Sequence, residues 1–265
     1  MRDDVVRLAA GTDDATDIVI DVNDAPFIVQ PIPALLATLP LLGITLYDEQ
    51  VETLAHYLDL LLTTNQRMNL TAIRDRELAE VRLLADSLTL VPFIPSSATR
   101  LIDVGSGGGI PGFPIAIACP SLDVTLADAT GKKVAFLRDT AAALGLGTVH
   151  AVQARAEEMG HDPVHREQYD VVVARAVARL ATLMEYTLPL LRKGGVGIFP
   201  KGSLAQEEVD EAAKALMILG HATVELHDSP LDGTTLVIVH KKARTPHEYP
   251  RRIGVPTQSP ILGQV

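Results

Sequence analysis

The sequence predicts an α/β fold built on a mostly parallel β-sheet that helices cover on both faces. In the C-terminal two thirds of the chain, short β-branched runs alternate with segments of helical periodicity. This alternation is typical of parallel strands joined by helical crossovers. The last two apolar runs, at 223–227 and 234–242, are instead separated by a loop containing Asp-Ser-Pro and Asp-Gly. Because such a loop is a turn signal, the sheet is expected to end in an antiparallel hairpin.

The N-terminal third of the chain is expected to have two parts. Residues 1–33 are rich in Asp and end in Pro-Ile-Pro, so we expect a disordered or loosely attached extension. Residues 34–97 are expected to be a helical region. Within it, apolar residues at helical spacing predict helices over 46–63 and roughly 76–91, and Pro92 stops the second helix.

Residues 98–242 are expected to form the core, and 243–265 a basic, Pro-containing C-terminal segment. Five parallel strands followed by a hairpin are the strand plan of a Rossmann-like S-adenosylmethionine-dependent methyltransferase, with seven strands in all. A dinucleotide dehydrogenase would continue with parallel crossovers. The predicted strands are 100–104, 122–128, 148–154, 169–175, 195–202 and the two hairpin runs; the predicted helices are 111–119, 131–144, 179–191 and 203–219.

Composition narrows the class of protein. The chain has 265 residues, of which 47% are hydrophobic and 21% charged, as in a folded globular protein. Its one cysteine, Cys119, excludes a disulfide within the chain and a thiolate metal cluster, and it fits a reducing cytoplasmic setting. No apolar stretch approaches the roughly 20 residues that span a bilayer. We therefore expect a cytoplasmic protein without a membrane or metal partner.

The net charge of −10 argues against nucleic acid, because phosphate neutralisation needs Lys and Arg. However, residues 1–30 hold seven Asp against two Arg, which is half of the net charge. The densest basic segment, 241–252, holds five Lys or Arg against one Glu. A nucleic-acid partner is therefore not excluded by charge.

The segment DVGSGGGIPGFPIAIA, residues 103–118, predicts a ligand loop between a strand and a helix. It matches GxGxxG at Gly107, Gly109 and Gly112, and Asp128 ends the next strand. Both features suit a dinucleotide as well as S-adenosylmethionine, since either ligand offers ribose hydroxyls to the acid. The glycines alone could also serve a tight turn.

Asp103 discriminates between these ligands. It ends the first predicted strand at the mouth of the ligand crevice. A carboxylate there would repel a pyrophosphate, whereas it would attract a ligand with a positive charge. S-adenosylmethionine carries an ammonium and a sulfonium and has no phosphate, so Asp103 favours it as the cofactor.

Several further motifs flank this loop. They are NLTAIRD (69–75), DSL (86–88), GKKVAFLR (131–138), RAEE (155–158), ARAVARL (174–180), FPKG (199–202) and YPRRIGVP (249–256). With the glycine loop and Asp128, they make the chain resemble the RsmG (GidB) family of ribosomal RNA small-subunit methyltransferases over roughly residues 40–260. The resemblance implies an enzyme that uses S-adenosylmethionine to methylate N7 of one guanine in 16S rRNA. It also implies that the partner is the 30S subunit or its assembly intermediate.

The resemblance assigns cofactor contacts motif by motif. It implies contacts from Gly105, Ile110, Asp128, Ala156, Glu157 and Arg175. The charge argument and the glycine pattern add Asp103, Gly107 and Gly109 to the candidate cofactor-binding residues. The chain departs from the family pattern at Leu83, where the family usually has His after an arginine, so no role for that histidine carries over. Ala129 and Ala174 stand where the family commonly has Ser.

Guanine N7 carries a free lone pair and attacks a methyl sulfonium without losing a proton, so no general base is required and no catalytic side chain is assigned. A base in folded RNA must be presented unstacked, and amides and basic residues near the crevice would hold it. The RNA-binding candidates are Asn69, Arg74, Arg82, Arg138, Arg155, Arg175, Lys201, Arg251 and Arg252. A large RNA substrate suits a monomer.

Three other functions stay open at the level of sequence. The fold could methylate another substrate, or it could serve a non-catalytic RNA-binding protein in ribosome assembly. A dehydrogenase also matches the glycine loop and Asp128 taken by themselves.

Overall fold

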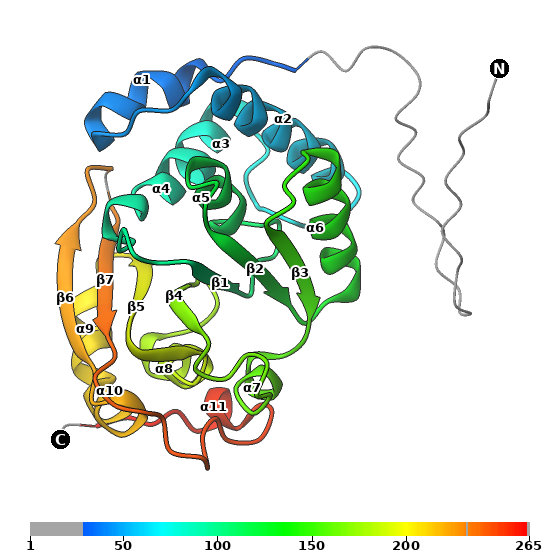
Figure 1. The fold of residues 1–265 in the computed structure, drawn as a ribbon. Helices are drawn as coiled ribbons and strands as arrows, with labels where there is room; N and C mark the ends of the chain where they lie inside the picture. The colour runs from blue at the N-terminus through cyan, green and yellow to red at the C-terminus, as the bar shows by residue number, and fades with distance from the viewer. Residues whose placement is uncertain (1–28, 232, 264–265) are drawn as a thin grey trace, which may run out of the picture.

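The structure, a computed structural model, describes residues 29–231 and 233–263 and contains a seven-stranded sheet in the order β3-β2-β1-β4-β5-β7-β6 (Figure 1). Strands β1 to β5 pair in parallel, and β7 is antiparallel to both β5 and β6. The parallel sheet and its closing hairpin are thus confirmed. The strands are β1 Arg100–Val104, β2 Asp123–Asp128, β3 Val149–Gln153, β4 Tyr169–Val173, β5 Leu191–Lys201, β6 Thr223–Asp228 and β7 Thr235–His240.

Helices cover both faces of this sheet (Figure 1). On one face lie α1 Pro33–Leu42, α2 Asp48–Asn65, α3 Arg76–Ala79, the π-helix η1 Glu80–Ala85, α4 Asp86–Leu88, the 3-10 turn η2 Val91–Phe93, α5 Gly112–Ala118 and α6 Gly131–Ala143. On the other lie α7 Ala156–Met159, α8 Leu180–Thr187, α9 Ala205–Glu211, α10 Ala213–Gly220 and α11 Val255–Gln258.

Alternate residues of each central strand enter two separate hydrophobic cores. Leu101 and Val171 belong to the core under α5 and α6, whereas Ile102 and Val172 belong to the core under α8 and α10. Because side chains alternate along a strand, a strand covered on both faces is apolar at every position. This burial explains the uninterrupted β-branched runs of the sequence.

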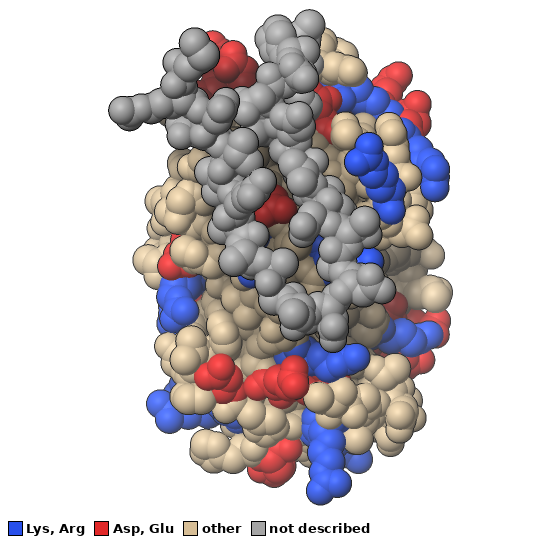
Figure 2. All heavy atoms as spheres, turned by 90° about the vertical axis from the view of Figure 1, so that its right-hand side faces the viewer, with Lys and Arg blue, Asp and Glu red and all other residues tan. Residues whose placement is uncertain are grey.

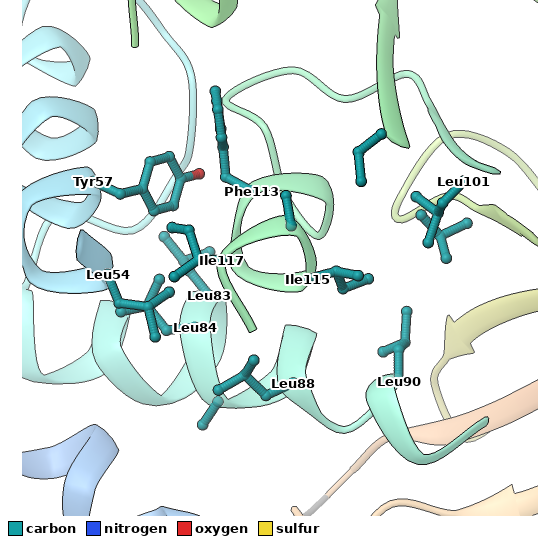
Figure 3. Packing of buried hydrophobic residues seen from close by; sticks show 14 of the residues in the cluster. Leu54, Tyr57, Leu83, Leu84, Leu88, Leu90, Leu101, Phe113, Ile115 and Ile117 are labelled. Carbon is teal, nitrogen blue, oxygen red and sulfur yellow. The ribbon is translucent and has the colours of Figure 1, made fainter. Parts of the chain in front are cut away.

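The N-terminal helices share the first of these cores with the sheet. Figure 3 shows Leu54 and Tyr57 of α2 and Leu84 of η1 directed toward Phe113 and Ile117 of α5. All five side chains are buried. The helical region therefore supports the helix that follows the glycine loop, so it belongs to the same packing unit as the core.

Several boundaries differ from the sequence prediction. The helix expected over 203–219 is two helices, α9 and α10, which meet at the buried Ala212 and both pack against α8. The helix expected over 179–191 ends at Thr187 because Pro189 has no N–H to continue it. The helix expected over 76–91 contains the π-helical turn η1.

The remaining differences lie in short or terminal segments. Helices α7 and α11 have four residues each, which is too short for a periodic signal. Most of the expected acidic extension, residues 1–28, lies outside the described residues. At the end of this extension, the backbone N–H of Gln30 donates to the Asp59 carboxylate on α2, and Ile32 is buried. The chain is therefore already attached to the helical region before α1.

Candidate functional site

The sheet order predicts a ligand crevice at the ends of β1 and β4. Strand β1 leads into α5 on one face, and β4 leads into α8 on the other. Ligands of open α/β sheets bind where the strand order reverses in this way, outside the carboxyl ends of the strands. The loops 105–111 and 174–179 follow β1 and β4, so they border this crevice.

The glycine loop needs residues without a side chain at two points in particular. Gly107 has a φ of +57° and its N–H faces Asp128, and Gly109 has a φ of +90°. A Cβ added at Gly109 would lie 2.1 Å from the Phe113 ring. The next residue, Ile110, is half-buried and precedes the turn into α5. Glycine at these two positions therefore permits the backbone path of the loop and its close packing on Phe113.

Asp103 lies at this loop with an unpaired oxygen. Its side chain is fully buried, and Oδ2 accepts a hydrogen bond of 3.0 Å from the Gly112 N–H. Among the described residues, no donor reaches Oδ1. Burial raises the pKa of Asp103 to about 7, and the Gly112 hydrogen bond offsets part of this rise. A buried carboxylate oxygen without a donor is costly, so it favours a ligand that supplies one.

Asp128 is held beside the same loop. Its Oδ2 accepts from the Gly107 N–H at 3.0 Å, and its Oδ1 accepts from the Thr130 N–H at 2.8 Å. The Lys133 ammonium lies 3.9 Å from Oδ2. Each oxygen keeps a second lone pair, so Asp128 can still accept from a ribose hydroxyl.

These two acids test whether the cofactor expected from the sequence suits the site. Asp103 offers an unpaired oxygen to a cationic group, and Asp128 offers fixed acceptors to a ribose. Between the two acids, an added Cβ on Gly107 would meet no side chain within 4 Å. The space beside this backbone position is therefore free for a ligand. The residues present therefore fit S-adenosylmethionine.

Tyr57 of α2 supports the loop, although it belongs to none of the motifs found in the sequence. Its hydroxyl donates to the Gly108 carbonyl at 2.8 Å, and its ring lies 5.0 Å from that of Phe113 (Figure 3). Burial and, to a smaller extent, the charge of Asp103 raise the pKa of Tyr57 well above its ordinary value. The hydroxyl therefore stays protonated and remains a donor. Tyr57 looks like an ordinary core residue of an amphipathic helix, so the sequence carried no signal for this role.

We expect Tyr57→Phe to lower the free energy of unfolding by about 1–2 kcal/mol, because the buried Gly108 carbonyl loses its donor. The loosened loop should also weaken cofactor binding several-fold. Chemical denaturation and titration calorimetry measure the two effects. Tyr47→Phe is the matched control, since the Tyr47 side chain is 79% exposed and should show neither effect. Equal behaviour of the two variants would contradict the role given to Tyr57.

Arg175 follows β4 and joins the core to the helical region. Its guanidinium lies 3.0 Å from Oδ2 of Asp86 and donates to the Arg82 carbonyl at 2.7 Å. Asp86 is almost fully buried, and burial raises its pKa although Arg175 and Arg82 lower it. Arg175 thus lies at the crevice with its charge paired. Asp86 was part of the DSL motif, but the sequence assigned it no role.

Ala156 and Glu157 begin α7, beyond the end of β3. The Glu157 side chain is buried and accepts from the Gly254 N–H at 3.0 Å. This carboxylate faces the C-terminal segment. A cofactor would therefore contact α7 through the helix backbone and the Ala156 side chain. A hollow of about 530 Å³ lies between α7 and this segment; its lining includes Glu157, Arg251 and Arg252.

The C-terminal segment is packed against the core. The Arg166 guanidinium donates to four carbonyls, those of Gly160, Thr245, Pro246 and Tyr249. Arg251 forms a two-pronged ion pair with Glu185, whose side chain is fully buried. Its neighbour Arg252 is exposed. The two arginines of the YPRR motif therefore have different surroundings.

The other RNA-binding candidates are spread over several elements. Asn69 and Arg74 are exposed on the loop before α3, which Asn65 holds by accepting from the N–H groups of Leu70 and Thr71. This loop lies against the glycine loop, since a Cβ on Gly108 would be 3.4 Å from that of Leu70.

The remaining candidates differ in exposure. Arg82, Arg138 and Arg155 are exposed on η1, on α6 and before α7, and the charge of Arg82 also acts on Asp86. Lys201 is half-buried and pairs with Glu208. Figure 2 shows basic side chains at several separate places on one face, with acidic ones between them.

In the described part of the chain, no helix is long and apolar enough to cross a membrane. Between residues 29 and 263, apart from the undescribed residue 232, no group of three or more His, Cys, Asp or Glu could hold a metal ion.

The family model and the most similar curated sequences agree on one family. The GidB family model, described as rRNA small subunit methyltransferase G, matches residues 50–231. A ribosomal RNA small subunit methyltransferase G of Roseiflexus castenholzii is 47% identical over 223 residues, which cover 83% of this chain and 95% of the relative. The same-named protein of Chloroflexus aggregans is 44% identical over 86% of this chain and 97% of its own. A solved putative S-adenosylmethionine-dependent methyltransferase of Methanococcus maripaludis aligns with a TM-score of 0.48 and 18% identity, covering 63% of this chain and 90% of that one.

Proposed function

The chain belongs to the rRNA small subunit methyltransferase G family, and we propose that it transfers a methyl group from S-adenosylmethionine to N7 of one guanine in 16S ribosomal RNA. The observation that carries the cofactor assignment within the site is the unpaired Oδ1 of the buried Asp103. This oxygen lies where the strand order reverses, and a cationic hydrogen-bond donor on the ligand would satisfy it.

The site supports an acceptor atom that needs no general base. Asp103 accepts from Gly112, Asp128 accepts from Gly107 and Thr130, and Asp86 pairs with Arg175. We therefore assign these carboxylates to holding the protein and its ligand. Guanine N7 fits such a site because its lone pair attacks without prior deprotonation.

Bound S-adenosylmethionine supplies a methyl group on a positively charged sulfur. The protein then has to align this group with the acceptor and exclude water from the crevice. We propose that Asp103 holds the ammonium and Asp128 the ribose. The methionine end of the cofactor would lie against Gly105, Gly107, Gly109 and Ile110. The adenine would lie against Ala156 and Glu157, and Arg175 would lie at the mouth of the crevice.

We propose RNA contacts from the basic and amide side chains that the structure leaves at the surface. These are Asn69, Arg74, Arg82, Arg138, Arg155 and Arg252. Arg175 and Arg251 pair with Asp86 and Glu185, so we assign them to holding the protein together. The proposed RNA contacts would thus come from residues 34–97, from the core at Arg138 and Arg155, and from the C-terminal segment at Arg252.

The proposed substrate is the 30S subunit or its assembly intermediate, and the proposed location is the cytoplasm, where that substrate is found. We propose a monomer as the active unit, since this suits a large RNA substrate.

Incubation of the protein with methyl-labelled S-adenosylmethionine and 30S subunits tests the proposed function. We expect the label in a single 16S nucleotide, and the digested nucleoside should co-migrate with 7-methylguanosine. Label in another methylated nucleoside, or in ribosomal protein alone, would refute the N7 assignment. Asp103→Asn is the control and should give strongly reduced labelling at a cofactor concentration below its weakened dissociation constant.

A further inference from the structure

The Lys201 ammonium, at the end of β5, is engaged inside the protein. It donates to the Ala178 carbonyl at 2.7 Å and lies 2.8 Å from Oε2 of Glu208 on α9. The side chains of Lys201 and Glu208 are only 12% and 15% exposed. A phosphate would therefore have to compete with two short internal contacts to reach this charge.

These contacts hold the loop 174–179 between β4 and α8. Lys201 fixes its Ala178 carbonyl, and Oε2 of Glu208 also accepts from the Leu180 N–H at 2.7 Å. Within the loop, Ala176 has a φ of +54°, a left-handed conformation that is unfavourable for a residue with a side chain. Such a conformation persists where surrounding contacts determine it.

The same loop forms one wall of the crevice. Val177 is 36% exposed, and one of its γ-carbons lies 2.7 Å from where a Cβ on Gly105 would be. The loop thus touches the first glycine after β1, directly at the point where the strand order reverses. In the proposed reaction, a methyl donor over the glycine loop and an incoming acceptor would meet beside Val177.

We propose that Lys201 is a positioning residue, which together with Glu208 fixes the loop 174–179 as the acceptor-side wall of the crevice and does not bind RNA phosphate. This inference rests on the proposed function. Alignment of the reacting atoms dominates a reaction without a general base, and a displacement of about 1 Å can cost roughly 100-fold in rate. Loss of the pair should therefore lower kcat and leave RNA affinity largely intact.

The test compares Lys201→Met with Glu208→Gln in single-turnover and steady-state methylation of 30S subunits. We expect kcat to fall about tenfold or more in both variants, with little change in KM for the subunit. The salt dependence of subunit binding should stay as in the unchanged protein. A phosphate contact predicts otherwise: Lys201→Met would reduce the salt slope by about one, and Glu208→Gln would strengthen binding by freeing the ammonium.

Three controls keep the outcomes distinct. Asp210→Asn makes the same charge change on α9 at an exposed position and should leave kcat unchanged. Arg74→Gln, at a proposed phosphate contact, shows the size of a genuine change in salt slope. Thermal unfolding and calorimetry with S-adenosylmethionine confirm that each variant is folded and binds cofactor at the assay temperature.

Unchanged kcat in folded Glu208→Gln, or a reduced salt slope in Lys201→Met, would overturn the inference and leave the proposed function standing. Absence of methyl transfer by the unchanged protein would instead refute the proposed function.

Discussion

Replacement of Asp103 by Asn is expected to weaken S-adenosylmethionine binding about 100-fold at pH 7.5. Asn has nearly the same shape, so the packing against Gly112 is kept while the charge is lost. A hydrogen bond to a charged group contributes about 1.5–3 kcal/mol, which corresponds to roughly 10- to 100-fold in affinity. Here the carboxylate is fully buried, which places the effect at the upper end. Titration calorimetry measures it.

The same interaction should depend on pH. Burial raises the pKa of Asp103 to about 7, so in the free protein the carboxyl is neutral below this pH and charged above it. Cofactor binding is therefore expected to strengthen as the pH rises through about 7. It should weaken again above about 8, where the ligand's own α-amino group loses its proton. Asp103→Asn should lack the rise through pH 7 and keep the decline.

Stability should respond with the opposite sign. The folded protein keeps the Asp103 proton up to about pH 7, whereas the unfolded chain releases it near the ordinary value of 3.8. The folded state therefore binds more protons between these values, and the contribution of Asp103 to the free energy of unfolding falls as the pH rises from about 4 to about 7. Denaturation across this range should show a smaller fall for Asp103→Asn.

5′-Methylthioadenosine provides the matched control for the ligand, since it keeps the adenine and ribose and lacks the amino-acid end. Its affinity should be nearly equal for the unchanged protein and Asp103→Asn. An equal loss for both ligands would mean that the substitution distorts the glycine loop, and it would contradict an ammonium contact.

Arg251→Ala is expected to lower the free energy of unfolding by about 3 kcal/mol. The substitution removes the guanidinium from the fully buried Glu185 carboxylate. Of the contacts between the two residues, only the hydrogen bond from the backbone N–H of residue 251 remains. Removing one partner of a buried ion pair costs about 3–5 kcal/mol because the other charge stays buried. For a chain of this length, the melting temperature should fall by roughly 10 °C.

Arg252→Ala is the control at the neighbouring position. Arg252 is exposed, so its loss should change stability by less than about 0.5 kcal/mol and instead weaken binding to 30S subunits. A double variant with Arg251→Met and Glu185→Leu should recover most of the stability, because both charges are then absent. Equal stability of the two single variants would contradict the structural role of Arg251.

Much of the fold could be predicted from local patterns. The alternation of strands and helices, the glycine loop and the final hairpin each depend on residues close together in sequence. Boundaries were less predictable where packing decided them. The break at Ala212 and the short helices α7 and α11 arise from contacts with α8 and the C-terminal segment, which no local periodicity encodes.

The sequence by itself determined the strand plan and the glycine loop, and it supplied the charge argument from which we infer a cationic ligand at Asp103, because each follows from backbone requirements or charge at one position. Only the tertiary structure decided which basic residues are available to RNA. Arg175 pairs with groups on the helical region about 90 positions earlier, and Arg251 with Glu185, 66 positions away. Tyr57 reaches Gly108 across 51 positions. A side chain's charge or hydroxyl is visible in the sequence, whereas the partner that engages it is fixed only when distant segments pack together.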